Sequence, residues 1–256
     1  MTSLGVTTYR LVNQSSLVPG NTLDRMAAAL QTQAREAASP AWYNLNVNLT
    51  VVVAQHSPGD PPPPPAPAGQ MDIVLLDDSD VADALGYHDI TINGRPYSRV
   101  FTRSVLQHGG GVLDGGTIGL SVASVASHEV IESVCDPECN VWASSGDRLV
   151  AYEACDPVQS QSYTIDGVLV SNWVTANWFV SGAPGPWDRL GKLRGPRTIA
   201  KGGYAIAASL THEHNVMAQQ DTTPQWRRAS RNHPASRTFQ RLNGITRPPV
   251  PKPSAH

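Results

Sequence analysis

The chain has 256 residues, with 21 acidic and 19 basic side chains and a formal net charge of −2 at pH 7. No segment approaches the roughly 18 consecutive apolar residues of a membrane span, and the first residues lack the basic and apolar regions of a signal peptide. These features argue against an integral membrane protein and against signal-directed secretion. The 40% of apolar residues, together with 21 Gly and 21 Pro, is typical of a loop-rich globular protein with a sizeable core.

The first half of the chain predicts strands around a single early helix. Asn21 and Thr22 are typical capping residues, and apolar side chains then recur at helical spacing until Pro40 ends the helix. Strict alternation or dense apolar character predicts strands elsewhere in this half. The segments are residues 7–12, 45–53, 71–76 and 99–106.

Residues 56–70 form a Pro-rich insertion between two of these strands, with five consecutive prolines. Such a sequence is stiff and extended and has no core of its own. Because a buried strand resumes at Met71, we expect the insertion to connect two strands of one domain.

Chemistry is concentrated in residues 120–137, an apolar segment of helical periodicity that ends at Pro137. His128 and Glu132 project from the same side of a helix because they are four residues apart. In H-E-x-x-H enzymes two histidines at this spacing bind Zn²⁺, and a carboxylate oxygen is also an acceptable zinc ligand. The alternative is an ordinary surface pair, but the apolar flanks place both side chains beside the core.

Further acidic residues follow closely, namely Asp136, Asp147, Glu153 and Asp156. Like charges gathered in one place repel one another unless a cation offsets them, which favours a metal site. Asp136 can join that site only if the helix ends near Cys135, as Pro137 suggests. The alternative role for Asp136 is that of a residue in the turn after the helix.

The motif H-E-x-x-E-x-x-x-D-P at His128–Pro137, followed by Asn140-x-Trp142 and Glu153-x-x-Asp156, resembles an uncharacterised zincin-like family of bacteria and tailed phages. The similarity extends to Asp77–Val81, Ala84–His88, Gly94–Tyr97 and Gly202–Tyr204. The resemblance implies a metal more firmly than a reaction. It also implies an α+β fold, with a zincin-like mixed sheet, a central site helix and a small C-terminal lobe.

Carried onto this chain, the resemblance implies that His128 and Glu132 are metal ligands. Glu153, Asp156 or both would complete the site, with Asp136 as a further candidate, and Glu129 would be the base that activates water. The implied metal is Zn²⁺, with Ca²⁺ as an alternative, because Glu153 and Asp156 could form an oxygen cluster. A glutamate at position 132 reduces the positive charge felt by a bound water, which leaves peptidase activity open.

The three cysteines, Cys135, Cys139 and Cys155, all fall around this region. A Cys/His zinc cluster with His128 lacks the second C-x₂-C pair that makes such a site specific. A disulfide between Cys139 and Cys155 and buried reduced thiols are the other two interpretations, and the cysteine count does not decide among the three.

The second half of the chain predicts four short strands, at residues 162–165, 168–170, 178–180 and 204–208. Trp173, Trp178 and Trp187 are expected to pack a small second lobe. His212 and His214 would share one face of a strand and could bind a metal, although loop histidines are commoner.

We assign residues 1–221 to the zincin-like domain and residues 222–256 to a basic, Pro-rich C-terminal arm that includes a short helix at 225–232. The arm carries seven basic residues and no acidic one. It is expected to contact other virion or assembly proteins, with a merely solvated tail as the alternative. Trp226 and Phe239 are its only aromatic residues, which argues against a module that reads nucleic acid.

Two functional hypotheses follow from these observations. The first is a phage virion-associated structural protein with a zincin-like metal-binding domain. The alternative is an active metal-dependent peptidase or hydrolase, in which an edge strand above the site helix binds an extended peptide by β-addition. Either protein would reside in the virion or the host cytoplasm, and would be extracellular when carried by a virion. No membrane partner is expected.

Overall fold

The computed structural model describes residues 6–38, 42, 48–54, 56–80, 84–91, 93–145, 148–209 and 216–219. Its largest sheet has five strands in the order β2-β1-β3-β5-β4. The strands are β1 (Thr8–Asn13), β2 (Thr50–Val53), β3 (Gln70–Leu76), β4 (Gly86–Ile90) and β5 (Pro96–Phe101). Four of them run parallel, and β4 pairs antiparallel with β5 at one edge.

The strand register places alternate side chains of β1 on the two faces of this sheet. Tyr9 and Leu11 are completely buried and lie opposite Met71 and Ile73 of β3. Arg10, between them, is partly exposed and forms an ion pair with Asp72. One face of the sheet is therefore apolar and carries the core, as the period of two in a strand requires.

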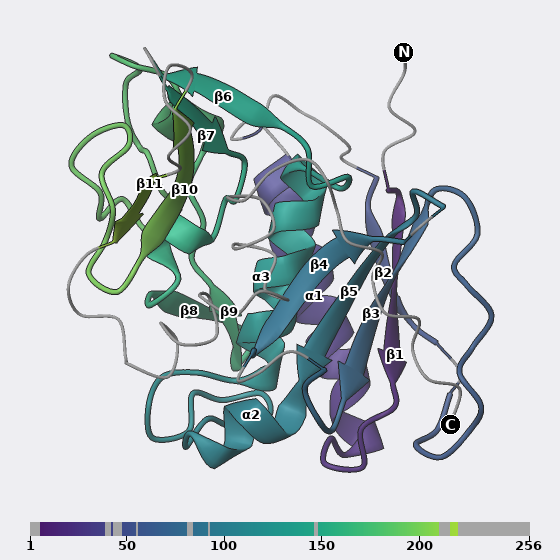
Figure 1. Cartoon of the computed structure of the whole chain (residues 1–256). Coiled ribbons are helices and arrows are strands. Elements are labelled where there is room, and N and C mark those ends of the chain that lie inside the picture. Colours follow the sequence, from purple (N-terminus) through teal and green to yellow (C-terminus); the bar gives the residue numbers. More distant parts are fainter. Residues whose placement is uncertain are drawn as a thin grey trace.

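Two helices cover the apolar face, α1 (Leu23–Ala38) and α3 (Val122–Cys135), and they contact each other (Figure 1). Helix α1 follows a short 3-10 turn, η1 (Gly20–Thr22), and buries Met26, Leu30 and Ala34 at helical spacing. The helix predicted between Asn21 and Pro40 is therefore confirmed over the described residues.

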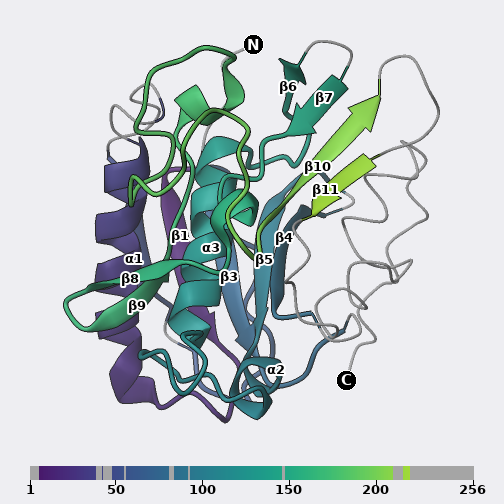
Figure 2. The same cartoon turned by 90° about the vertical axis from the view of Figure 1, so that its left-hand side faces the viewer.

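Helix α3 lies between the sheet and the second lobe, and it contacts β4, β5, α1 and β9 (Figure 2). A reciprocal capping box starts it, because Ser124 N donates to Ser121 Oγ at 2.9 Å and Ser121 N donates to Ser124 Oγ at 2.8 Å. The helix ends at Cys135, and Asp136 has a non-helical φ of −146°. Pro137 explains this end, because the residue before a proline avoids the helical region.

The Pro-rich insertion connects β2 to β3, which lie on opposite sides of β1. Arg10 donates to the carbonyl of Pro64 at 3.0 Å, and Arg95 donates to the carbonyl of Ala66 at 3.1 Å. These bonds hold the insertion against the sheet on the face that Arg10 occupies. The expectation that it joins two strands of one domain is confirmed.

The second lobe contains a four-stranded sheet in the order β11-β10-β7-β6 and a separate β8–β9 hairpin. The strands are β6 (Trp142–Ser145), β7 (Arg148–Ala151), β8 (Ser162–Ile165), β9 (Val168–Ser171), β10 (Tyr204–Ser209) and β11 (Val216–Gln219). Trp173 and Trp178 are buried in the hydrophobic core of this lobe, and Trp187 packs against it. The three tryptophans therefore pack the lobe as predicted.

Three predicted strands differ from the structure. The strand expected at residues 45–53 begins only at Thr50 within the described residues. The strand expected at residues 99–106 ends at Phe101, and α2 (Thr102–Gln107) follows, with the Thr102 hydroxyl donating to the Leu76 carbonyl at 2.9 Å. Residues 178–180 do not form a strand, since Trp178 belongs to the 3-10 turn η4 (Ala176–Phe179). The sequence analysis also missed β4, whose Tyr-His-Asp core shows no apolar alternation.

The prediction of an α+β fold built on a mixed sheet is confirmed. None of the described helices is long and apolar enough to cross a membrane. Several predicted features lie outside the described residues and stay predictions. They are residues 45–47 of the second strand, Asp147, His212, His214 and the arm at 222–256.

Candidate metal centre

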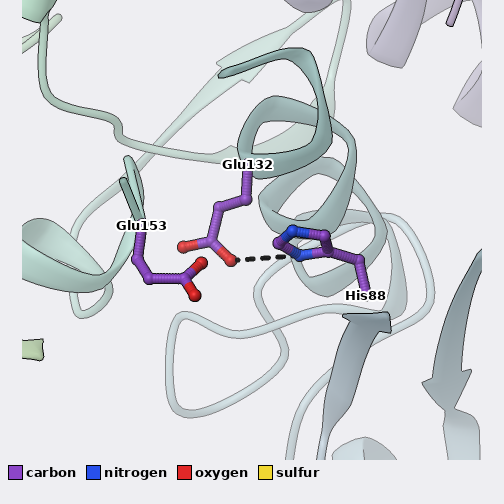
Figure 3. Close-up of side chains that lie close together, drawn as sticks. All are labelled: His88, Glu132 and Glu153. Atoms are coloured by element: carbon purple, nitrogen blue, oxygen red, sulfur yellow. Dashed lines mark ion pairs between the residues drawn. The ribbon is translucent and has the colours of Figure 1, made fainter. Parts of the chain in front are cut away.

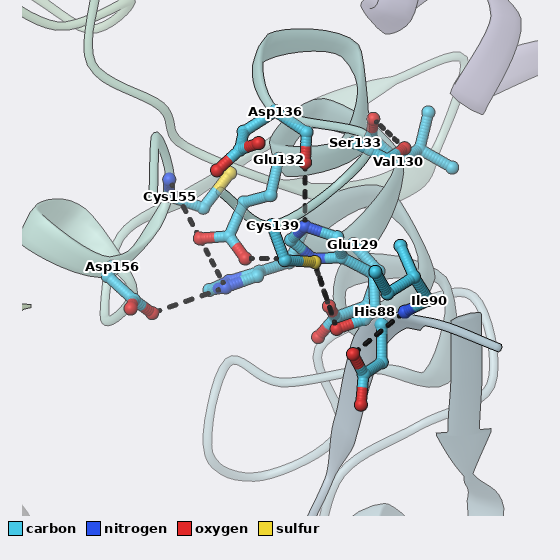
Figure 4. A network of polar contacts seen from close by, with 12 residues as sticks. His88, Ile90, Glu129, Val130, Glu132, Ser133, Asp136, Cys139, Cys155 and Asp156 are labelled. Carbon is cyan, nitrogen blue, oxygen red and sulfur yellow. Dashed lines mark hydrogen bonds and ion pairs between the residues drawn. The ribbon is translucent and has the colours of Figure 1, made fainter. Parts of the chain in front are cut away.

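Five ionisable side chains gather where α3, β4 and the segment after β7 meet (Figure 4). Strand β4 contributes His88, helix α3 contributes His128, Glu129 and Glu132, and the 3-10 turn η3 (Asp156–Val158) contributes Asp156. Glu153, between β7 and η3, lies beside them (Figure 3). All except His128 are buried, and the four carboxylates are only 1–5% exposed.

The first donor group comprises His128, Glu132 and Asp156, whose ligand atoms all lie within 4.8 Å of one another. His128 Nε2 is 3.1 Å from Glu132 Oε1 and 3.4 Å from Asp156 Oδ1. The structure therefore brings together three of the predicted ligands. The His128 side chain is 17% exposed, so this group is accessible on its histidine side.

A second donor group comprises His88, Glu132 and Glu153, again with ligand atoms within 4.8 Å. Figure 3 shows His88 and Glu153 on either side of Glu132, with His88 Nδ1 3.6 Å from Glu132 Oε2. Glu153 thus belongs to a different group from Asp156. The two groups share Glu132.

His88 is the site residue that the sequence analysis missed. It precedes His128 by forty residues and joins the site because β4 contacts α3. The one sequence signal was its place in the segment Ala84–His88 that resembles the zincin-like family.

Gly86 lets β4 approach α3 closely enough to deliver His88. A Cβ at this position would lie 2.7 Å from Val125 Cγ1 and 2.9 Å from the Arg99 carbonyl oxygen, which is closer than real Cβ contacts. It would also lie 3.3 Å from Glu129 Oε1. Any larger residue would push the strand away from the site.

Glu129 belongs to neither donor group. Its Oε2 is 3.4 Å from His88 Nδ1. Figure 4 shows Glu129 turned toward β4, the strand that carries His88.

Asp136 is not brought into either donor group. Its carboxylate accepts hydrogen bonds from Asn140 N at 2.9 Å and from Val141 N at 3.0 Å. Its backbone carbonyl accepts a bond from His88 Nε2 at 3.2 Å. The residue therefore orders the turn after α3, as in the alternative interpretation, and the expectation that it binds metal finds no support.

The buried carboxylates perturb the protonation of the site. Burial is the main cause that raises the pKa of Glu132 to about 8; the attraction of His128 lowers it, and repulsion from Glu153 and Asp156 raises it further. Burial alone would lower the pKa of His128, but Glu132 and Asp156 raise it well above the usual 6.5. Without a cation, the site therefore tends to take up protons.

No disulfide joins the three cysteines. Burial, followed by the charge of Glu132, raises the pKa of Cys135 and of Cys155 well above the usual thiol value. Both therefore stay as thiols rather than thiolates, and neither donor group includes a cysteine. The Cys/His zinc cluster considered from the sequence is not what the structure assembles.

Comparison of the chain with protein-family models, with curated proteins and with solved structures finds no match. The resemblance to a zincin-like family therefore stays a prediction. Conclusions about the site therefore rest on the positions of its side chains.

Proposed function

We propose that the chain is a zincin-like, divalent-metal-dependent hydrolase domain that acts on an extended peptide. The observation that carries this proposal is the group of His128 and Glu132 from α3 and Asp156 from η3, whose ligand atoms lie within 4.8 Å of one another beside Glu129 of the same helix. These are the ligand and base positions of a zincin helix, with glutamate in place of the second histidine.

The donor set fits a resident divalent cation. Asp156 Oδ2 is buried and has no hydrogen-bond partner among the described residues, and a buried carboxylate oxygen without a partner is costly. A cation held by His128, Glu132 and Asp156 would remove that cost. An imidazole with carboxylates suits Zn²⁺, whereas Ca²⁺ takes oxygen ligands, so we favour zinc.

When bound, the cation would polarise a substrate carbonyl and favour ionisation of the attacking water. Glu129 accepts the proton from that water and passes it to the leaving group. Its carboxylate is 5% exposed, so little bulk water competes for it. A ligand set with two carboxylates donates more negative charge than two histidines would, and we expect slower turnover than with histidine at position 132.

The substrate would lie along β4. This strand pairs with β5 on one side and with no other described strand, and it carries His88 directly beside α3. An extended peptide could therefore continue the sheet by β-addition, with its scissile bond next to the accessible side of His128.

A purely structural metal in a virion-associated protein is the second candidate. The carboxylate at position 132 favours it, because it weakens the chemistry expected of a zincin site. The arm at 222–256, which would contact neighbouring subunits, lies outside the described residues.

Glu129→Gln separates the two candidates, because it keeps the shape of the side chain and removes the base. In the hydrolase, this change should retain the metal and lower peptide cleavage by about 10²-fold or more. Glu138→Gln is the matched control, since Glu138 is an exposed glutamate just after the helix. If zinc-loaded wild-type protein cleaves no member of a peptide library, the hydrolase proposal is wrong and the structural role is favoured.

A further inference from the structure

The hydrogen bonding of His88 fixes its tautomer. Nε2 lies 3.2 Å from the backbone carbonyl oxygen of Asp136, and a carbonyl oxygen only accepts, so Nε2 carries the proton. In a neutral ring, Nδ1 then presents a lone pair. A histidine whose other nitrogen donates to a backbone carbonyl is the usual arrangement of a metal ligand.

The atoms that face this lone pair are themselves acceptors. Glu129 Oε2 lies 3.4 Å from His88 Nδ1, and Glu132 Oε2 lies 3.6 Å from it. A lone pair among carboxylate oxygens is unfavourable unless a positive charge sits between them. That charge is either a proton on Nδ1 or a cation.

Glu132 presents its two oxygens to different histidines. Oε1 lies 3.1 Å from His128 Nε2, whereas Oε2 lies 3.6 Å from His88 Nδ1. Each of the two donor groups includes Glu132. A carboxylate can bind one cation through each oxygen, but an imidazole nitrogen binds only one. The bridge therefore explains why glutamate can replace histidine at this position.

Charge balance points the same way. The four buried carboxylates, Glu129, Glu132, Glu153 and Asp156, are at most 5% exposed and carry a formal charge of −4 when ionised. One divalent cation would leave half of this charge without an offset. Two would match it, with both histidines neutral.

We propose that the site holds two divalent cations bridged by Glu132, one bound by His128, Glu132 and Asp156 and the other by His88, Glu132 and Glu153. The inference rests on the proposed function for the first cation and adds the second. The second cation would supply further positive charge for the oxygens of the transition state. It would thereby offset the weaker activation expected with glutamate at position 132.

Metal stoichiometry tests the second site. Wild-type protein and variants are dialysed to equilibrium against Zn²⁺, and metal is counted per folded chain, with folding checked by circular dichroism. We expect two cations in the wild type and one in Glu153→Gln and in His88→Ala. The exposed variant Glu138→Gln should keep two. Glu153→Gln preserves side-chain shape, so it carries the test if His88→Ala does not fold.

Two further measurements sharpen the result. Glu132→His restores the ligand pair of H-E-x-x-H and removes the bridge, so it should bind one cation. Protein loaded with Mn²⁺ should give the electron paramagnetic resonance signal of an exchange-coupled pair, which Glu153→Gln should reduce to that of isolated ions.

The outcomes separate this inference from the proposed function. One cation in the wild type, unchanged in His88→Ala and Glu153→Gln, would overturn the second site and leave the first. His88 would then carry its positive charge as a protonated ring. Absence of any bound cation in the wild type would overturn both proposals.

Discussion

Lowering the pH should release the cation, because Glu132 takes up a proton in the buried site. In the metal-free protein the pKa of Glu132 is raised to about 8, by burial first and also by Glu153 and Asp156. Metal binds the ionised carboxylate, so proton and cation compete. Through Glu132 alone, each pH unit below 8 should weaken binding up to tenfold, or about 100-fold between pH 8 and pH 6, and protonation of the ligand His128 acts in the same direction.

The same protonation makes the metal-free protein less stable as the pH rises. A carboxyl group whose pKa is higher in the folded state stabilises the fold while it is protonated. Between the unfolded value of 4.5 and the folded value of about 8, the free energy of unfolding should fall by about 3–5 kcal/mol. The pKa of His128 is also raised, since its attraction to Glu132 outweighs burial. Its contribution is complete below pH 6.5 and is lost above the folded pKa, in the same direction.

Thermal unfolding of chelated and zinc-loaded protein from pH 5 to pH 9 measures both effects. The melting temperature of chelated protein should fall with rising pH, and the increase produced by zinc should grow. Glu132→Gln removes the titrating group and should flatten the slope of the chelated protein. If the chelated wild type keeps a constant or rising melting temperature between pH 5 and pH 8, the argument from buried carboxylates is refuted.

Three further changes have defined outcomes. His128→Ala should reduce the drop in melting temperature on chelation, since it removes the accessible ligand of the first donor group and leaves the second group in place; a variant that still responds fully would contradict that assignment. Gly86→Ala should destabilise the protein by about 1–3 kcal/mol in a denaturant titration, because the added Cβ would lie 2.7 Å from the Val125 side chain of α3. Gly20→Ala is the control and should change stability little, because a Cβ there meets nothing within 4 Å. Asp136→Ala should lower the free energy of unfolding by about 1–3 kcal/mol, because it leaves two backbone N–H groups without their acceptor. Metal content should not change, and loss of a cation in this variant would show that Asp136 is a ligand.

The sequence predicted the parts of the fold whose hydrophobic pattern is regular. Helix α1 and strands β1 and β3 alternate or repeat cleanly because each buries one face against the same core. Strand β4 was not predicted, because its residues serve the site and the close contact with α3 and therefore lack apolar alternation. Gly86 allows the close approach to α3, and His88 places a ring nitrogen near Glu132. Neither residue contributes to the hydrophobic pattern by which a strand is predicted.

The candidate site divides in the same way. His128, Glu129 and Glu132 were found because helical spacing converts sequence separation directly into geometry. Asp156 and Glu153 were found by their motif, but assigning each to a separate donor group required the path of the chain after β7. Asp136 lies equally close in sequence, yet backbone N–H groups of the following turn occupy its carboxylate. Spacing alone does not show such competition.

The placement of Glu132 connects stability to function. Glu132 is only 1% exposed, and Glu153 and Asp156 raise its pKa further. A buried carboxylate of this kind stabilises the helix less than an apolar side chain at the same position would. Neighbouring positions on the same helix, such as Val130 and Ile131, are completely buried and apolar. Local rules of folding are usually broken where function requires it. With the proposed cations bound, attraction would replace that repulsion, so the carboxylates that destabilise the metal-free site are the ones that we propose as ligands.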